Sequence, residues 1–478
     1  MSNHTAPPSP ILVVADHKWR DLPGMALLKT ILEDKYQLPT LVIGYGAVGA
    51  CLRYFRPRAL VLTTLISPRE QDFARAAHAI GAAVITIPAD PGSTESMKAL
   101  LRSPEVWEVC DLYLAWGAAM AKLVVEDGYV PKDKVTVTGS GRFDFYQPPL
   151  RDYLLSREAL CARYSLRSNC PIITCGTTFV LASYLEDEKR LRFNEKDFER
   201  RGLAHLPGFA NVYNLAEKDK AAQDLVLDWI RQTCVNFPDA EFIVKPHPYE
   251  SFAPYKQLWQ ACRRDGITNL HLAASDYIWD LLNNAVVHVH TGSTTGLEAW
   301  LMHVPTVNLQ PSGYARFKSA RDGKRLELDS LEDVQEDAKT LHERINFYLG
   351  GGQIEPALAL KRKNFLEQWF YRLDGHAAER QAAAIADLMK NYHPKHNLEA
   401  RLPWAGYRTL LTLLQYHING LLGRDFDAPF FGSRRNVPVD FLGQRDKVVR
   451  SQDVVFWANR IREALKGPAK SGLESPDP

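Results

Sequence analysis

Short apolar runs alternate with amphipathic segments along most of this chain. Between the runs, segments such as 25–35 and 73–81 repeat their apolar residues at helical spacing. Strands that are apolar on both faces and separated by helices are typical of a parallel sheet covered on both sides. We therefore expect residues 1–150 to form a Rossmann-like α/β domain. Its predicted strands lie within 11–16, 40–46, 59–64, 83–88, 107–117 and 134–139.

The same alternation begins again after residue 150. A helical pattern over 151–166 leads into apolar runs separated by helical patterns at 221–237, 276–285 and 294–303. This predicts a second doubly wound domain over 151–390, with a helical extension over 391–478. The charged stretch 185–202 predicts a solvated insertion. The predicted strands of this domain lie within 171–178, 241–248, 269–273, 286–292 and 305–309.

Composition agrees with a globular chain of two large domains. Of the 478 residues 46% are hydrophobic and 24% are charged, which excludes a disordered or fibrous protein. The formal charge of +2 argues against a general nucleic-acid binder. The seven cysteines form no CxxC pair, which favours free thiols in a reducing cytoplasm. The chain starts without the pattern of a signal peptide, and no run is long enough for a spanning helix.

A glycine pattern in the first half invites a dinucleotide-binding interpretation. Gly44, Gly46 and Gly49 form GxGxxG after the run TLVI. However, the motif follows the second predicted strand, and the next strand ends in threonines where a ribose-binding acid is expected. We interpret it as a tight turn between a strand and a helix.

The second half carries stronger signals for binding an anion. Lys245-Pro246-His247-Pro248 follows the predicted strand EFIV. The prolines would end the strand and stiffen the loop, which presents Lys245 and His247 at its carboxyl end. Both side chains could bind a phosphate, and His247 could donate a proton to a leaving phosphate. The alternative is a kinked loop with solvated side chains.

A turn rich in glycine and hydroxyl groups follows some forty residues later. VVHVH leads into Thr291-Gly292-Ser293-Thr294-Thr295-Gly296-Leu297-Glu298, which predicts a strand, a turn and a helix start. Free backbone N–H groups and hydroxyls at a helix start can bind phosphate. Glu298 could accept hydrogen bonds from a ribose. Ser293 or Thr294 could instead be an ordinary helix cap, and Glu298 a first-turn acid.

A third hydroxyl-rich turn, Thr174-Cys175-Gly176-Thr177-Thr178, ends the first strand of the same domain. In a parallel sheet it would open onto the same edge as the other two turns. Gly176 and Thr177 thus join the candidate phosphate site. The sequence has no P-loop, HExxH or Ser-His-Asp signature, and we expect neither a metal nor a bound cofactor.

These residues resemble those of GT-B glycosyltransferases. The likeness is to bacterial surface carbohydrate biosynthesis proteins, a group related to capsule Kdo transferases, bacterial sialyltransferases and CDP-glycerol glycerophosphotransferases. It implies that His247-Pro248 and Ser293-Thr294-Thr295 hold the donor's phosphate, with Glu298 toward the ribose. The segment 135–144 resembles the closing strand of the N-terminal domain, except that Ser140-Gly141 replaces the usual Asn-Pro. The segment 374–389 is similar to the family's late helix.

The resemblance implies that a first-domain carboxylate catalyses transfer, as base or nucleophile. Asp90 follows the strand AVITIP, and Asp16 and His17 follow the first strand. In the same loop Lys18 and Arg20 could engage an anionic acceptor or a donor carboxylate. Ordinary turn and loop roles are the alternative for all of these residues.

Four other charged residues in the first domain have mainly structural interpretations. Glu126-Asp127-Gly128 also fits the acid-before-glycine pattern of related transferases, but it predicts a helix end. Arg142 and Asp144 lie near the interdomain junction, where a structural ion pair is the alternative to a role in the site.

The C-terminal tail is basic: residues 401–470 carry 12 Lys/Arg against six Asp/Glu. Within it, 404–423 mixes Leu, Tyr and Trp with few charges. Packing back on the N-terminal domain is our preferred interpretation. An interfacial helix resting on anionic lipid, as a peripheral membrane contact, is the alternative.

Together these features predict a cytoplasmic glycosyltransferase in surface polysaccharide synthesis, with no nucleic-acid partner. The donor is expected to be a nucleotide-activated sugar, preferably CMP-linked Kdo or a nonulosonic acid. The acceptor is expected to be a saccharide or a lipid-linked molecule. A nucleotide-sugar 2-epimerase, a CDP-glycerol glycerophosphotransferase and a non-catalytic binding module of an assembly complex remain alternatives.

Overall fold

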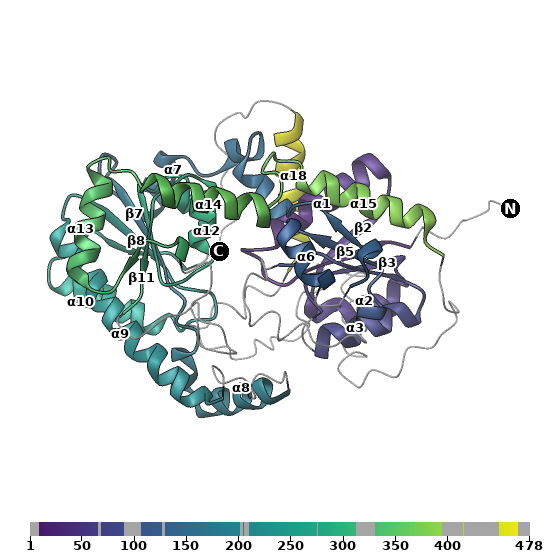
Figure 1. Ribbon diagram of the computed structural model, residues 1–478, viewed down its shortest axis with the longest axis horizontal. Helices are drawn as coiled ribbons and strands as arrows, with labels where there is room; N and C mark the ends of the chain where they lie inside the picture. The colour runs from purple at the N-terminus through teal and green to yellow at the C-terminus, as the bar shows by residue number, and fades with distance from the viewer. Residues whose placement is uncertain are drawn as a thin grey trace.

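The chain folds around two parallel six-stranded sheets, which lie side by side in Figure 1. Helices surround both sheets, and the expected architecture of two Rossmann-like domains is confirmed. The computed structural model describes residues 9–65, 68–89, 107–126, 130–200, 204, 210–274, 276–311, 330–393, 414 and 449–466.

The first sheet has the strand order β2-β1-β3-β4-β5-β6. Its first four strands begin in register, with Ile11 opposite Thr40 on one side and Ala59 on the other. All residues of β1, β3, β4 and β5 are buried, which explains their uniformly apolar sequence. The strands are β1 (Ile11–Ala15), β2 (Thr40–Gly44), β3 (Ala59–Leu62), β4 (Ala83–Thr86), β5 (Leu112–Ala115) and β6 (Val135–Val137).

The second sheet has the order β12-β11-β10-β7-β8-β9. The chain starts at the centre with β7, builds outward through β8 and β9, and then crosses to β10 on the other side. The short strand β12, which the periodicity does not predict, closes the far edge. The strands are β7 (Ile172–Gly176), β8 (Glu241–Lys245), β9 (Leu270–Leu272), β10 (Val287–His290), β11 (Thr306–Leu309) and β12 (Val334–Gln335).

Helix α1 (Leu22–Tyr36) is apolar on nearly every side because it is covered on several sides. It contacts β1 and β2 of the first sheet and also the late helices α15 (Ala377–Asn391) and α18 (Ser451–Lys466). Pro23 stands in its first turn, where no N–H partner is needed. The other helices of the first domain are α2 (Val48–Phe55), α3 (Pro68–Ala79) and α6 (Ala118–Glu126).

The second sheet is flanked by helices that follow its strands. The predicted helix at 221–237 is longer than expected, since α9 begins at Val212 with Asn211 as its cap. The expected insertion at 185–202 contains a further helix, α8, and is not simply a solvated loop. The helices are α7 (Arg157–Tyr164), α8 (Glu188–Arg200), α9 (Val212–Asn236), α10 (Ala253–Arg264), α11 (Ile278–Leu282), α12 (Thr295–Leu301) and α13 (Ala338–Leu349).

Two late helices return to the first domain. Helix α14 (Pro356–Trp369) runs back to α6, and its end lies so close to Gly117 that an added Cβ would be 2.3 Å from the Gln368 carbonyl oxygen. Helix α15 packs on α1. Gly141 meets α15 at a distance that leaves a Cβ only 2.9 Å from that of Ala378. The second unit expected over 151–390 therefore ends in a helix that covers the first sheet.

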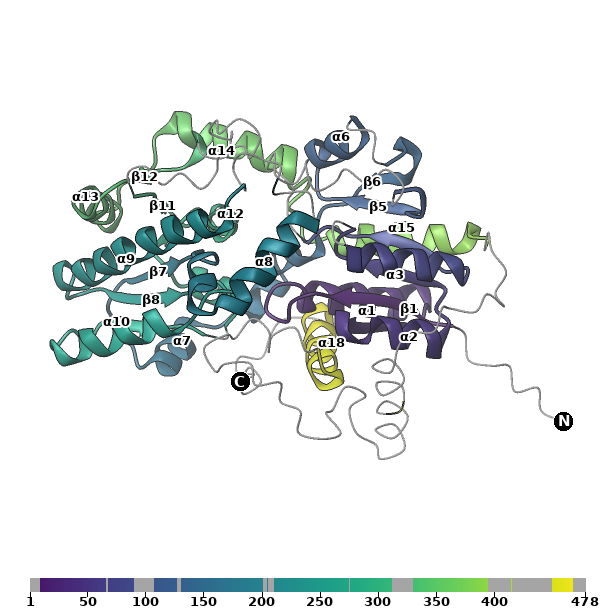
Figure 2. The ribbon, with the colours of Figure 1, turned by 90° about the horizontal axis from the view of Figure 1, so that it is seen from below.

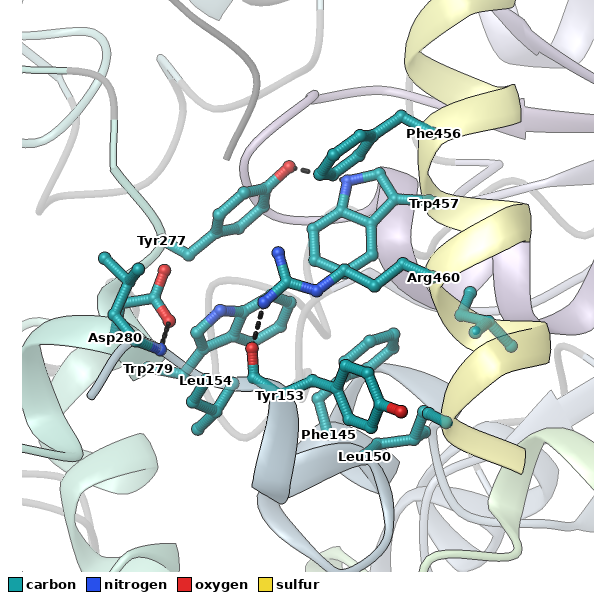
Figure 3. Close-up of a pocket in the computed structure, with 13 residues that line it drawn as sticks. Phe145, Leu150, Tyr153, Leu154, Tyr277, Trp279, Asp280, Phe456, Trp457 and Arg460 are labelled. Carbon is teal, nitrogen blue, oxygen red and sulfur yellow. Dashed lines mark hydrogen bonds between the residues drawn. The ribbon is translucent and has the colours of Figure 1, made fainter. Parts of the chain in front are cut away.

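Helix α18 lies beside α1, beneath the first sheet in Figure 2. It also contacts the second domain through Trp457, whose indole N–H donates to Tyr277 at 2.9 Å. Figure 3 shows this aromatic cluster, with Arg460 donating to the Tyr153 carbonyl. Helix α18 thus braces both domains at the junction. Of the hydrophobic stretch 404–423, only Leu414 belongs to the described residues.

All seven cysteines are free thiols, as expected, and only Cys170 is not fully buried. Within the described ranges, no helix combines the length and hydrophobicity needed to cross a bilayer.

Candidate functional site

The site is built on the point where the second sheet reverses its winding. The chain leaves β7 toward β8 on one side, and β10 pairs with β7 on the other. Ligands of open α/β sheets bind beyond the carboxyl ends of the strands at such a switch point. The three hydroxyl- and histidine-bearing turns expected from the sequence follow β7, β8 and β10, so they all lie at this edge.

Hydrogen bonds join the turn after β7 to the turn after β10. The Thr178 backbone N–H donates to Thr291 Oγ1 at 3.0 Å, and the Thr291 N–H donates to the Gly176 carbonyl at 3.1 Å. Gly176 must stay small, because a Cβ there would lie 2.7 Å from Thr295 Oγ1. The two turns therefore form one continuous surface.

The turn after β8 is joined to the same surface by Glu250. Its Oε1 accepts from Thr177 Oγ1 at 3.0 Å and from the His247 backbone N–H at 2.9 Å. Tyr255 donates to its other oxygen and lies 2.7 Å from Thr177 Oγ1. Sequence reasoning missed Glu250, since nothing in the sequence shows that an acid past the His-Pro pair turns inward and is buried.

The loop after β8 holds His247 in one tautomer. Its Nδ1 accepts the Tyr249 backbone N–H at 3.2 Å, so the proton of the neutral ring lies on Nε2. The Tyr249 ring stacks on it with centroids 5.6 Å apart. Lys245, the last residue of β8, is half-buried beside it.

Most backbone N–H groups of the turn after β10 are already hydrogen-bonded within the protein. The Gly292 N–H donates to Asn308 Oδ1 at 2.9 Å, and the Ser293 N–H donates to His290 Nδ1 at 3.3 Å. Ser293 Oγ accepts the Thr295 N–H at 3.2 Å. Ser293 is therefore buried in a capping role, whereas Thr294 is exposed and Thr295 is half-exposed. The hydroxyls of these two threonines are the groups that the turn offers to a ligand.

A ribose-binding acid would face solvent, but Glu298 does not. Its carboxylate is 3% exposed and accepts from Arg142 and from Tyr146, which belong to the 3₁₀ segment Gly141–Tyr146 after β6. A ribose would have to compete with these two donors. The structural ion pair considered for Arg142 exists, with Glu298 as its partner. Asp144 instead accepts two backbone N–H groups at the start of α15.

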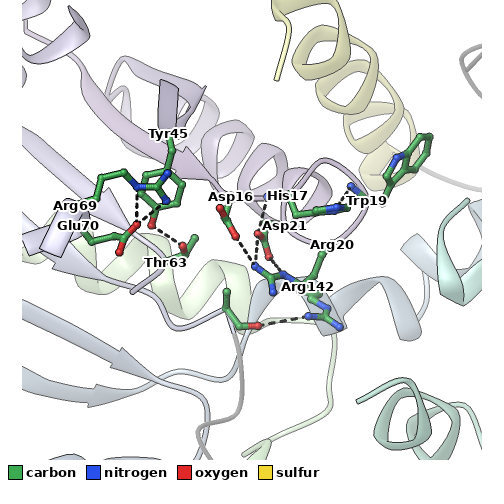
Figure 4. Close-up of polar contacts among 11 residues, drawn as sticks. Asp16, His17, Trp19, Arg20, Asp21, Tyr45, Thr63, Arg69, Glu70 and Arg142 are labelled. Carbon is green, nitrogen blue, oxygen red and sulfur yellow. Dashed lines mark hydrogen bonds and ion pairs between the residues drawn. The ribbon is translucent and has the colours of Figure 1, made fainter. Parts of the chain in front are cut away.

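The loop after β1 faces the second domain and is tied by its own charges (Figure 4). Arg20 donates to Asp16 at 3.2 Å and to Asp21 at 2.8 Å. Lys18 pairs with Asp453 of α18 at 2.7 Å. Both cations expected to receive an anionic acceptor are therefore already paired, and such an acceptor would have to displace these carboxylates.

Four further residues near this loop were missed by sequence reasoning. Glu70, buried on α3, accepts from Arg69, whose guanidinium lies 4.3 Å from the centroid of the Tyr45 ring. The Tyr45 hydroxyl lies 2.9 Å from Thr63 Oγ1. Tyr45 stands inside the glycine pattern at 44–49, so its only sequence signal was the motif interpreted as a turn. That segment is a short 3₁₀ turn followed by α2.

The remaining first-domain candidate, Asp90, lies just outside the described residues, as do Asp127 and Gly128. Arg142 Nη1 donates to the carbonyl oxygen of Ala89, the residue before Asp90, at 3.5 Å. A small pocket opens here between the ends of β4 and β6 and the start of α1, lined by Asp21, Ile87, Ala89, Ser140 and Arg142 among others. Helix α6 runs to Glu126, the last residue described before that gap, so the predicted helix end at Gly128 is not tested.

The two halves of the site meet at Tyr249. Its ring contacts His17 of the first domain edge-on, with centroids 6.4 Å apart, and it stacks on His247 of the second. His17 Nδ1 accepts the Trp19 backbone N–H at 3.3 Å, which repeats the local geometry of His247. One histidine from each domain, each with an equivalent local turn, thus contacts the same tyrosine ring. The described residues contain no group of three side chains suited to hold a metal ion.

Glu250 gives the site a testable pH dependence. Burial raises its pKa to about 7 from the usual 4.5, so the folded protein holds this proton more tightly than the unfolded chain. The resulting contribution of Glu250 to the free energy of unfolding is fully present below pH 4.5 and is lost as the pH rises through 7. Between pH 5 and 8 the wild type should lose about 2 kcal/mol of unfolding free energy that Glu250→Gln does not lose.

Urea unfolding of both proteins at four pH values would measure this difference. Glu195, which lies on α8 and is only partly buried, supplies the matched control: Glu195→Gln should follow the wild type across the range. Parallel stability curves for wild type and Glu250→Gln would contradict the prediction.

No family model and no curated protein matches this sequence. Solved structures do resemble it. A protein described as a UDP-N-acetylglucosamine 2-epimerase from Listeria monocytogenes superimposes with a TM-score of 0.51 at 11% identity, over 82% of this chain and 99% of that one.

Two further structures give lower scores. The UDP-GlcNAc 2-epimerase from Neisseria meningitidis, solved with UDP-GlcNAc, has a TM-score of 0.48 at 11% identity, over 79% of this chain and 100% of that one. The wall teichoic acid polymerase TagF, solved with CDPG, has 0.49 at 10% identity, over 80% and 89%. At such low identity the likeness to the Listeria protein establishes the fold alone: this chain has the GT-B architecture of two Rossmann-like domains.

Proposed function

We propose that this protein is an enzyme that acts on a nucleotide-activated sugar, and specifically a glycosyltransferase of surface polysaccharide synthesis. The donor is a CMP-activated acidic sugar such as Kdo or a nonulosonic acid. The acceptor is a saccharide or a lipid-linked molecule that approaches from the first domain.

One observation supports this proposal above the others: the turns after β7, β8 and β10 are hydrogen-bonded into one surface at the switch point. The surface offers the His247 imidazole, the Lys245 ammonium and the hydroxyls of Thr294 and Thr295. These groups are donors, as a phosphate requires. Gly176 and Thr177 support the surface from below. The Kdo, sialyl and glycerophosphate families that the sequence resembles use an HP motif and a Ser/Thr turn in this way.

The chemistry follows from which atoms carry protons. His247 Nε2–H can donate to the phosphate that leaves as the sugar is transferred. A carboxylate must accept the proton of the acceptor hydroxyl, and Asp16, oriented by Arg20, is the described candidate on the facing loop. In this proposal His17, whose local turn matches that of His247, would orient the acceptor.

A nucleotide-sugar 2-epimerase is the second candidate, because the Listeria protein that shares the fold over 82% of this chain is described as one. Such an enzyme would need no acceptor. Incubation with UDP-GlcNAc alone, followed by proton NMR, separates the two: an epimerase yields a 2-epimer without acceptor, whereas a transferase leaves the sugar unchanged.

A nucleotide panel tests the proposed donor. CMP or CDP should raise the melting temperature of the wild type by several degrees, since a ligand that binds only the folded state stabilises it. His247→Ala should abolish this shift, because it removes the phosphate donor. His376→Ala, an exposed histidine at the start of α15, is the control that should retain it. If no pyrimidine nucleotide stabilises the wild type, the proposal is wrong.

A further inference from the structure

His288 lies fully buried beneath the proposed phosphate surface. It stands in β10 directly opposite Thr174 of β7 in the register of the sheet. Its Nδ1 lies 2.9 Å from Thr174 Oγ1, and its Nε2 lies 2.9 Å from Thr295 Oγ1. The imidazole therefore connects a buried hydroxyl to a hydroxyl that reaches the surface.

The ring carries a single proton. Burial, together with the neighbouring His290 ring, lowers the pKa of His288 well below its usual 6.5, so the imidazole is neutral. One ring nitrogen must donate and the other must accept. The hydrogen bonds that link Thr174, His288 and Thr295 can therefore run in either of two directions. We call these the two polarities of the relay, and they differ in where the Thr295 hydroxyl hydrogen points.

Thr174 decides between the two polarities. Its side chain is 1% exposed, and among the described residues its hydroxyl has His288 Nδ1 as its hydrogen-bond partner. A buried hydroxyl hydrogen without an acceptor is costly, more so than an unfilled oxygen lone pair. Thr174 therefore donates to Nδ1, the ring proton lies on Nε2, and Nε2–H donates to Thr295 Oγ1.

We propose that Thr174 and His288 form a buried positioning relay that keeps the Thr295 hydroxyl hydrogen directed outward, toward a phosphate oxygen. This inference rests on the proposed function, which supplies the phosphate. A phosphate oxygen only accepts, so a threonine locked in the opposite polarity could not bind it. Gly176 completes the arrangement, because a Cβ there would lie 2.7 Å from Thr295 Oγ1 and 3.3 Å from the His288 ring.

Binding of CMP and of cytidine by calorimetry separates this role from a merely structural one. Thr295→Val should weaken CMP binding at least about tenfold, the loss of one hydrogen bond to a charged group, and leave cytidine binding unchanged. His288→Phe should weaken CMP binding by roughly threefold, because a freed hydroxyl spreads over three staggered positions. The double variant should match Thr295→Val alone, since both changes act through one hydroxyl.

The matched control is His271→Phe, another buried histidine, on β9 away from the three turns. It should leave the ratio of CMP to cytidine affinity unchanged. If His288→Phe leaves that ratio unchanged, or if its effect adds fully to that of Thr295→Val, the relay is overturned while a donor site dependent on His247 still stands.

A second measurement needs neither a folded His288→Phe variant nor a bound ligand. Nitrogen-15 NMR of histidine-labelled wild type, free of ligand, reads the tautomer directly. We expect His288 to be neutral with its proton on Nε2, and the Thr295→Val spectrum identifies its signal. A proton on Nδ1, or a doubly protonated ring, would overturn the relay. If no pyrimidine nucleotide binds, the proposed function fails, and this spectrum still decides the polarity.

Discussion

Replacing Arg142 with methionine should lower the free energy of unfolding by about 3–5 kcal/mol, because it leaves the Glu298 charge buried and unpaired. The two side chains are 12% and 4% exposed, and Glu298 keeps only the Tyr146 hydroxyl among its described donors. Since the pair joins the segment after β6 to α12, the variant should also loosen the two domains. Denaturant unfolding measures the first effect and small-angle scattering the second.

The double variant Arg142→Met, Glu298→Gln tests the cause. Glutamine carries no charge and can still accept from Tyr146, so most of the lost stability should return. The control is Arg75→Met, which breaks an exposed pair with Asp72 and should cost less than about 1 kcal/mol. A loss for Arg142→Met no larger than that for Arg75→Met would show that the buried pair does not hold the domains together.

Truncating Trp457 to alanine should destabilise the protein by about 3–5 kcal/mol and release α18. Trp457 is 5% exposed, and its ring meets those of Phe145 and Tyr277 edge-on with centroids 5.5 and 5.2 Å apart. Figure 3 shows the three residues in one cluster. The truncation also removes the hydrogen bond from the indole N–H to the Tyr277 hydroxyl. Because Asp453 on the same helix holds Lys18, release of α18 should free the loop that carries Asp16 and His17.

Val455 provides the matched control on the same helix. It is 56% exposed, so Val455→Ala should change stability by less than about 0.5 kcal/mol. Limited proteolysis should cut Trp457→Ala near α18 faster than either Val455→Ala or wild type, since local opening exposes the backbone. Equal cutting of all three proteins would contradict a bracing role for α18.

The strands were predictable because the fold buries them on both faces, which leaves an unbroken apolar run for each. The elements that the sequence did not predict correctly are those in which this apolar pattern is weak. Strand β12 has two half-buried residues, too few for any period. The first turns of α9 carry Glu217, Lys218 and Lys220, so their charge hides a helix that begins at Val212.

Parts of the candidate site could also be predicted, because its turns follow strands whose order along the chain is readable. The hydroxyl and histidine residues of three turns had to share the carboxyl edge of one sheet. Their supports could not be predicted. Glu250, His288 and Arg142 act through partners that lie 73, 114 and 156 positions away in the chain, and sequence spacing carries no information on such contacts.

The sequence by itself determined two parallel-sheet domains and the identity of the groups at one strand edge, since local periodicity and turn chemistry act over a few residues. Only the tertiary structure decided which of those groups are exposed and which are buried against partners. It buried Glu298 against Arg142 and Tyr146, paired Lys18 with Asp453, and placed α15 on the first domain with Asp144 at its start. The physical reason is the same each time: a buried charge or amide requires a partner, and that partner is chosen by proximity in space.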